Sequence, residues 1–394
     1  MVIIAGWLYK FVVPDESKII SWVRSRARPG NGLVIGIGDD AAVWRPTPGL
    51  DLLVCCDLSV EDIHFRTEWA EPRQIGHKSL AVTISDIAAM GGVPRYALLS
   101  AALPSGGPEG FFEQLFDGIF QLADKLDVRI IGGDTSRSPG PIFLDSMVVG
   151  ECARGRAVPR SGAGAGDLIF ATGSLGASAL GLYFLQTESS LLQTAPRSLE
   201  GPEASSSPAP GDRPGNNLNR GVTNISAGLP SNGPNVGQSP SNIVDLARAR
   251  HQSIERHRMP EPRVEAGKAI GESGLATAMI DISDGLSTDL SHIITESGQG
   301  AILYADSIPI AESVAMAKRA GAAIDPLSLA LHGGEEYELL FTARPVDRSR
   351  VEDLLRSVGL AVSCIGEVVA DPGLKLCADG VRSELIPSGY EHSI

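Results

Sequence analysis

The sequence predicts an α/β protein of two domains. Strand and helix patterns alternate along most of the 394 residues, and at roughly 100–200 residues per domain this length corresponds to two domains. The composition changes sharply once, over residues 189–242, where Pro, Gly, Ser and Asn dominate without apolar periodicity. Such a stretch buries too little surface to offset its ordering entropy, so we predict a disordered insertion that projects from the second domain.

Three elements open the first domain. An apolar strand is predicted over 33–35, and it runs into the acidic turn of residues 36–40. A second apolar strand over 52–56 ends at the carboxylate of Asp57. A helix is predicted over 78–90, because its apolar residues recur on one face and a glycine pair follows it, as is usual where a helix ends.

Three further elements complete this domain. A helix is predicted over 111–126 from apolar residues at i, i+3 and i+4 spacing. A strand over 128–131 ends in the Gly-Gly-Asp-Thr segment of residues 132–135, and another strand covers 142–149. The chain then becomes Arg- and Gly-rich over 151–166, which marks a domain boundary. We therefore predict domains at residues 1–152 and 153–394, with the insertion at 189–242.

The second domain repeats the alternation of strands and helices. Strands are predicted over 168–170 and 277–280, with a helix over 263–274 between them. The second of these strands ends in the acidic segment 281–285, after which an amphipathic helix begins. The segment 332–336, His-Gly-Gly-Glu-Glu, precedes a further apolar strand.

Charge and cysteine content exclude several classes of function. The 33 basic and 47 acidic residues give a net charge of −14, so we expect no nucleic-acid partner and no anionic membrane surface. No apolar run approaches the roughly 18 residues of a membrane-spanning helix. The five cysteines form no Cys-x-x-Cys pair, which argues against a disulfide framework or a zinc site and favours a reducing, cytoplasmic location.

Acidic residues recur at the predicted strand ends. Because sheets place ligands beside strand ends, these carboxylates are expected to gather in one crevice. Two unpaired carboxylates 4 Å apart repel by about 4 kcal/mol at an effective dielectric near 20, so a cluster needs cations. Hard oxygen ligands with few His or Cys favour Mg²⁺, which commonly bridges carboxylates to substrate phosphates. The alternative is that Asp and Gly are simply common in turns.

Asp86 supports the cluster. It lies within a predicted helix, and its neighbours at i−4 and i+4 are the apolar Val82 and Met90. A carboxylate on an apolar stripe must find a partner or ionise poorly, and a metal shared with the other aspartates would satisfy it. The alternative is an isolated aspartate on the helix surface.

Phosphate contacts are expected next to these acids. Gly132-Gly133 lets backbone N–H groups approach a phosphate closely. Ser283 and Asp284 open a helix, where capping and phosphate binding are compatible roles. Arg160 precedes a Gly-rich turn and is either a cationic contact or a solvated surface residue.

Other well-known catalytic motifs are missing. The sequence contains no P-loop, no G-x-G-x-x-G after a strand, no G-x-S-x-G and no H-E-x-x-H. His64 is a general base or a substrate contact in one interpretation and a structural histidine in the other.

Seven segments, taken together and in order, resemble the thiamine-monophosphate kinase family, which belongs to the superfamily of aminoimidazole ribonucleotide synthetase. The resemblance covers almost the whole chain apart from residues 1–14 and the insertion. The segments are GIGDDAAV (36–43), CCDLSVEDIHF (55–65), HKSLAVTISDIAAMGGVP (77–94), IIGGDTSR (130–137), RSGAGAGD (160–167), IDISDGLSTDL (280–290) and HGGEEYELLFT (332–342).

The resemblance implies a fold and a reaction. The fold is the two-domain aminoimidazole ribonucleotide synthetase-like architecture, in which a sheet of the N-terminal domain forms a homodimer and ATP is held between domains. The reaction is ATP + thiamine monophosphate → ADP + thiamine diphosphate, with several Mg²⁺ ions.

The resemblance also implies roles for individual residues. The metal-binding positions would be Asp40, Cys55, Cys56, Asp57, Asp86, Asp134, Asp281 and Asp284. ATP would contact Gly133, Asp134, Arg160 and Ser283. Thiamine monophosphate would contact His64, Glu335 and Tyr390.

Two features depart from the family pattern. The family has Ser/Thr-Thr where this chain has Cys55-Cys56, and thiols are poor partners for Mg²⁺. Either a backbone carbonyl serves there or one metal site is weakened. The insertion is the second departure, and we expect it in a surface loop away from the metals.

We expect direct in-line transfer of the γ-phosphoryl group without a phospho-enzyme, because the acceptor is already a largely ionised phosphate. The alternatives are a sister enzyme of the same architecture (aminoimidazole ribonucleotide synthetase, selenophosphate synthetase or the hydrogenase-maturation dehydratase) and a nucleotide- or Mg²⁺-binding protein without catalysis. The sequence lacks the reactive Cys of the second and the C-terminal Cys of the third.

Overall fold

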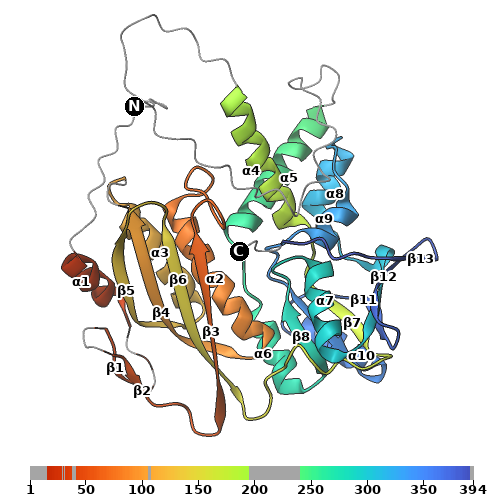
Figure 1. The fold of residues 1–394 in the computed structure, drawn as a ribbon, viewed down its shortest axis with the longest axis horizontal. Helices are drawn as coiled ribbons and strands as arrows, with labels where there is room; N and C mark the ends of the chain where they lie inside the picture. The colour runs from red at the N-terminus through yellow and green to blue at the C-terminus, as the bar shows by residue number, and fades with distance from the viewer. Residues whose placement is uncertain are drawn as a thin grey trace, which may run out of the picture.

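The computed structural model describes residues 16–28, 30, 32–37, 41–104, 108–194 and 240–390. Two halves, each built on a β-sheet with helices packed against it, follow one another along the chain (Figure 1). A small antiparallel pair, β1 (Leu33–Ile35) and β2 (Val43–Trp44), lies beside the first half. Among the residues described, no helix combines the length and the apolar character needed to cross a membrane.

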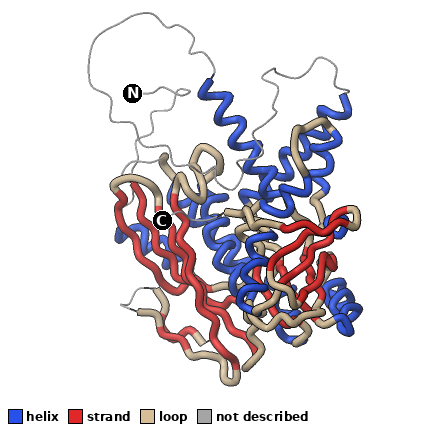
Figure 2. The backbone as a smooth tube through the Cα atoms, turned by 45° about the vertical axis from the view of Figure 1, so that its right-hand side comes forward, coloured by secondary structure: helices blue, strands red, loops and turns tan. Residues whose placement is uncertain are grey.

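The first half is a four-stranded sheet in the order β3-β6-β4-β5, in which β4 and β5 run parallel and the other neighbours antiparallel. Helices α2 and α3 pack against one face of this sheet (Figure 2). Its elements are α1 (Glu16–Arg26), β3 (Leu50–Val60), α2 (Pro72–Ala89), β4 (Val93–Pro104), α3 (Phe111–Lys125), β5 (Arg129–Ser138) and β6 (Phe143–Ala153).

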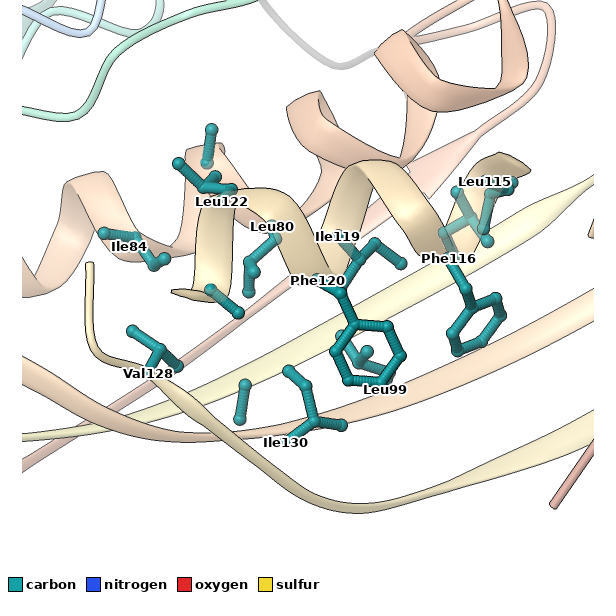
Figure 3. Close-up of a cluster of buried hydrophobic side chains, with 14 of the residues drawn as sticks. Leu80, Ile84, Leu99, Leu115, Phe116, Ile119, Phe120, Leu122, Val128 and Ile130 are labelled. Atoms are coloured by element: carbon teal, nitrogen blue, oxygen red, sulfur yellow. The ribbon is translucent and has the colours of Figure 1, made fainter. Parts of the chain in front are cut away.

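The core of this half lies between α2, α3 and the sheet. Leu80 and Ile84 of α2 meet Leu115 and Ile119 of α3 there, and the last two recur at the i, i+4 spacing of an amphipathic helix (Figure 3). The two helices approach closely at Gly76, where a Cβ would collide with the carbonyl oxygen of Leu115. This packing fixes the axis of α2, on which two of the site residues lie.

The second half is a seven-stranded sheet in the order β13-β12-β9-β11-β7-β10-β8. Within it β9 and β12 run parallel, and the other neighbours run antiparallel. Its strands are β7 (Leu168–Thr172), β8 (Ala276–Asp281), β9 (Gly300–Tyr304), β10 (Leu339–Ala343), β11 (Val362–Val369), β12 (Gly373–Ala378) and β13 (Val381–Glu384). Its helices are α4 (Ala177–Thr194), α5 (Pro240–Arg258), α6 (Val264–Ser273), α7 (Leu286–Ser297), α8 (Glu312–Arg319), α9 (Pro326–His332) and α10 (Arg348–Ser357), with 3₁₀ turns η1 (Ala305–Ser307) and η2 (Pro345–Asp347).

Most of the predicted elements are present, but several boundaries differ from the prediction, most clearly in α2, β3 and β5. Helix α2 begins six residues before the predicted 78, with Pro72 in its first turn, where proline is well tolerated. Strands β3 and β5 continue through Asp57 and through Gly132–Thr135 instead of ending there. The strands are longer because their backbone pairing continues past the acidic residue, with β6 in the case of β3 and with β4 in the case of β5.

The insertion is shorter than predicted, because both of its ends are helical. Residues 189–194 belong to α4 and residues 240–242 to α5, and the two helices lie side by side (Figure 1). An ion pair between Glu188 and Arg250 joins them, and the indole N–H of Trp69 donates a 2.7 Å hydrogen bond to Ser189. The predicted disorder of residues 195–239 lies outside the described residues.

Candidate active site

A pocket of about 750 Å³ lies between the two halves of the chain. Strand β3, helix α2 and the segment after β3 form one wall, and α4, the end of α5 and the loops after β8 and α9 form the other. The polar and charged residues that line it are Cys56, Asp57, Ser59, Asp62, His64, Arg66, Lys78, Asp86, Arg160, Ser178, Gln186, His257, Asp281, Ser283, Asp284, His332 and Glu335, together with Tyr183, Tyr337 and Tyr390.

Four of the predicted carboxylates meet in this pocket. Asp57 comes from the inner face of β3 and Asp86 from α2, while Asp281 ends β8 and Asp284 follows it. The carboxyl groups of Asp57 and Asp86 are close enough to share a hydrogen bond. Residues separated by more than two hundred positions are thus neighbours, as the sequence analysis expected.

Charge repulsion and burial perturb these groups. Burial, with the charges of Asp281 and Asp57, raises the pKa of the Asp86 carboxyl to about 8. Burial raises the pKa of Asp281 to about 6, although a hydrogen bond from Ser85 opposes the shift. Burial raises the pKa of Asp57 as well. Several carboxyl groups with raised pKa values lie together here, and bound cations would neutralise their charge.

The donor set fits a hard divalent cation. Among the described residues, the Oδ2 atom of Asp57 is buried without a hydrogen-bond partner, so it has a lone pair to offer. Ligand atoms of Asp284, Asp289 and His292 also lie within 4.8 Å of one another. Carboxylate oxygens in this number are the ligands that Mg²⁺ prefers.

Two of the expected nucleotide contacts stand beside the carboxylates. Arg160 lines both this pocket and a neighbouring pocket of about 550 Å³ that extends along β8 and α7, and its charge opposes the upward pKa shifts of Asp86 and Asp281. Ser283 lies between Asp281, the last residue of β8, and Asp284 in the loop that follows. The guanidinium is thus a fixed cation at the edge of an acidic cluster.

The three expected substrate contacts also line the pocket. His64 follows β3, and its Nδ1 accepts a 3.0 Å hydrogen bond from the Val60 N–H. Glu335 sits in a left-handed backbone conformation, with φ of 62°, in the loop after α9. Tyr390 lines the same space near the end of the described chain.

Glu335 is held by two basic side chains. Its Oε1 lies 2.7 Å from the Lys78 ammonium and its Oε2 lies 3.1 Å from Nδ1 of His257. Burial alone would raise the pKa of Glu335, but the charge and hydrogen bond of Lys78, together with the neighbouring histidines, hold that pKa below the usual range. Burial and the same lysine lower the pKa of His257 to about 3, so this imidazole is neutral.

Three predicted site residues do not join the cluster. Asp134 and Gly133 lie exposed on β5, at the opposite edge of the sheet from β3. Three strand spacings of about 4.8 Å separate these edges, or about 14 Å. The thiol of Cys55 turns toward α2 and donates to the Thr83 carbonyl at 3.2 Å, away from the main pocket. Asp40 lies outside the described residues.

The two cysteines cannot hold one cation with their thiols. Successive side chains of a strand point to opposite faces, and here Cys55 is half-buried against the helix while Cys56 is exposed on the outer face of β3, paired with Met147 of β6. Burial raises the pKa of the Cys55 thiol well above its usual value, so it is a neutral, inert group.

Sequence reasoning missed several residues that line or support the site. Lys78 lies eight positions before Asp86 on the same helix, a helical spacing that was available as a signal. Buried Asp289 accepts hydrogen bonds from the N–H groups of Asp284 and Gly285 and so shapes the β8–α7 loop. No local signal marked the pocket-lining residues Phe65, Trp69, Leu182, Tyr183, His257 and Tyr337.

Comparison with known proteins defines the class of protein first. Residues 38–152 match the family "AIR synthase related protein, N-terminal domain", and residues 230–378 match its C-terminal domain. The fold is therefore that of an AIR synthase related protein.

Comparison over the whole chain identifies more specific relatives. It is 33% identical to the thiamine-monophosphate kinase of Salmonella typhimurium, with 91% of each chain covered. Its structure matches the crystal structure of the thiamine-monophosphate kinase of Stenotrophomonas maltophilia with a TM-score of 0.70 and 31% identity, over 92% of this chain and 96% of that one. It also matches AaThiL complexed with AMPPCP and TMP, with a TM-score of 0.65 and 26% identity, over 89% of each chain. The chain belongs to the thiamine-monophosphate kinase family.

Proposed function

We propose that this chain transfers the γ-phosphoryl group of ATP to thiamine monophosphate, giving thiamine diphosphate and ADP. The observation that carries the proposal is the convergence of Asp57, Asp86, Asp281 and Asp284 in one pocket, in a chain of this family. Both reactants carry phosphates, and an acidic protein that brings two phosphates together needs a cation-binding cluster of this kind.

The proposed cofactor is Mg²⁺, in several ions, with ATP as the second substrate. Asp57, Asp86, Asp281 and Asp284 would hold the ions, and the unpartnered Oδ2 of Asp57 supports this assignment. When bound, Mg²⁺ supplies charge neutralisation for the phosphates. For Asp40 a role as metal ligand remains a proposal from sequence.

The chain's own residues then orient the reactants. Arg160 would contact the nucleotide phosphates, because its guanidinium is the cation beside the acidic cluster. Ser283 would contact ATP from the start of the loop that leads into α7, where backbone N–H groups attract phosphate. Positioning of this kind is worth about 7–11 kcal/mol of the barrier.

The acceptor needs little general-base help, since its phosphate has a second pKa of about 6 and is largely ionised near neutral pH. We therefore propose direct in-line transfer. A radiolabelled phosphoryl group that became covalently attached to the protein during turnover would refute this.

His64, Glu335 and Tyr390 would bind the organic part of the substrate. They line the same pocket as Phe65 and Tyr183, whose aromatic surface suits a planar heterocycle. A carboxylate such as Glu335 repels a phosphate, so it faces the organic part of the substrate.

A second copy of this chain is the proposed partner, bound through the four-stranded sheet. On the face of this sheet turned away from α2, Leu52, Val54, Leu58 and Met147 are all more than a third exposed. A contiguous apolar face of this kind marks an interaction surface. For Gly133 and Asp134 a contact with ATP remains a proposal from sequence.

A coupled assay tests the proposed activity directly. Purified protein with ATP, Mg²⁺ and thiamine monophosphate is expected to release ADP and to form a product with the mass of thiamine diphosphate. Thiamine and aminoimidazole precursors serve as controls. Nucleotide binding without ADP release that depends on thiamine monophosphate would instead support a non-catalytic binding protein.

A further inference from the structure

The Lys78–Glu335 ion pair joins the two halves of the chain inside the pocket. Lys78 comes from α2 and Glu335 from the loop after α9, and both line the pocket. Their side chains are 10% and 26% exposed, so the pair is largely shielded from solvent. Such a pair is formed at a considerable desolvation cost, so its contribution to stability does not explain its presence in the pocket.

Lys78 stands far from the acidic cluster although both belong to one helix face. Lys78, Val82 and Asp86 follow one another at i, i+4 and i+8 on α2, and all three line the pocket. Eight residues at 1.5 Å per residue place the lysine about 12 Å along the axis from Asp86. The Lys78 ammonium is engaged by the Glu335 carboxylate, 2.7 Å away.

Neighbouring residues fix the orientation of the Glu335 carboxylate. Its backbone is fixed in the left-handed region, with its N–H donating a 2.7 Å hydrogen bond to the Ser283 carbonyl. Its carboxylate is held from both sides, by Lys78 and by the buried His257. Each carboxylate oxygen can accept more than one hydrogen bond, so the pairing leaves acceptor capacity for a ligand.

The organic part of thiamine monophosphate carries one strong donor group, the exocyclic amine of its aminopyrimidine ring. We infer that Lys78 is a positioning residue for substrate selection, which holds the Glu335 carboxylate so that it accepts a hydrogen bond from this amine. The inference rests on the proposed function. It gives the lysine a role in choosing the substrate and none in phosphoryl transfer itself.

Steady-state kinetics of K78M, K78R and E335Q test the inference. K78M keeps the length of the side chain but removes its charge, and we expect KM for thiamine monophosphate to rise at least about tenfold, as for loss of a hydrogen bond to a charged group. KM for ATP and kcat should change less than about threefold. K78R, which retains the charge, should recover most of the affinity. The matched control is K125M, because Lys125 also forms a 2.7 Å ion pair, with Glu261, but at the surface.

A substrate analogue provides the selectivity readout. In oxythiamine monophosphate a ring carbonyl replaces the exocyclic amine, so the wild type should discriminate against it by about tenfold or more, and K78M and E335Q should lose most of that preference. The double variant K78M/E335Q should be no worse than E335Q, because the lysine acts through the glutamate.

Two results would overturn the inference. One is an effect of K78M on kcat or on KM for ATP with KM for thiamine monophosphate unchanged. The other is additive loss in the double variant, which would mean that Lys78 contacts the substrate itself. A wild-type protein without activity on thiamine monophosphate would refute the proposed function instead. If K78M does not fold, the inference is tested by comparing KM for thiamine monophosphate between K78R and E335Q.

Discussion

The hydroxyl of Ser85 donates a 2.6 Å hydrogen bond to the carboxylate of Asp281, and both groups are buried. Ser85 precedes Asp86 on α2, and Asp281 is the last residue of β8. The bond therefore ties the helix of the first half to the strand of the second at the point where the carboxylates meet. It also opposes the rise in the pKa of Asp281 that burial causes.

Ser85→Ala should weaken both the fold and the site. The change leaves a buried carboxylate oxygen without its donor, so we expect the free energy of unfolding to fall by about 1–3 kcal/mol. Urea denaturation measures this. Ser79→Ala is the control, because Ser79 is buried on the same helix but donates only to the Gly76 carbonyl within it. Equal losses of unfolding free energy in the two variants would show that the Ser85–Asp281 hydrogen bond stabilises the fold no more than a hydrogen bond within one helix.

Asp57→Asn and Asp86→Asn should abolish most of the activity while the fold survives. Each change removes a proposed metal ligand, so we expect turnover to fall by roughly 100-fold or more. Each change also replaces a carboxyl group whose ionisation the fold disfavours, so the metal-free variants should melt at or above the temperature of the wild type. Asp306→Asn, at an exposed carboxylate that does not line the pocket, is the control. Full activity of both variants at low Mg²⁺ would refute the cluster.

The stability of the metal-free protein should decrease as the pH rises. Asp86 and Asp281 have pKa values of about 8 and about 6, so the folded protein holds protons that the unfolded chain releases near pH 4. Because the folded state binds more protons between about pH 4 and 8, the free energy of unfolding falls with rising pH across this window.

Urea denaturation in EDTA at several pH values measures this slope. Saturating Mg²⁺ should flatten it, since bound cations keep the carboxylates ionised, and Asp86→Asn should reduce it in EDTA. A slope that is the same with and without Mg²⁺ would contradict the proposed metal site.

Val54→Asp should separate the proposed dimer. Val54 is 63% exposed on the outer face of β3, so the change should leave the fold of one chain intact but place a charge in the dimer contact. Light scattering after size exclusion should show half the mass of the wild type. Val346→Asp, at a valine that is 81% exposed in the second half, should keep the mass of the dimer. A monomeric wild type would contradict the proposal.

Local patterns predicted much of the fold. The apolar spacing of α3 gave its bounds to within one residue, and the four inward residues predicted for α7 (Leu286, Leu290, Ile293 and Ile294) are all buried. The apolar neighbours of Asp86 correctly marked it as a carboxylate that needs a partner, because helix periodicity alone places it on a packed face.

Long-range pairing decided what the sequence could not predict. Asp57 and Asp134 were both expected at strand ends, but both lie within strands whose ladders continue past them. Only the sheet order shows that one belongs to the cluster and the other to the far edge. In the same way, the Lys78–Glu335 pair joins residues more than 250 positions apart, and neither residue carries a local sign of the other.

The central claim is that carboxylates from both halves hold cations between two phosphate-bearing substrates. Anomalous diffraction from crystals grown with Mn²⁺ in place of Mg²⁺ and a non-hydrolysable ATP analogue tests it most directly. The account predicts anomalous peaks within about 2.0–2.5 Å of carboxylate oxygens of Asp57, Asp86, Asp281 or Asp284, next to the analogue's phosphates. Bound nucleotide with no peak at any of these four residues would contradict it.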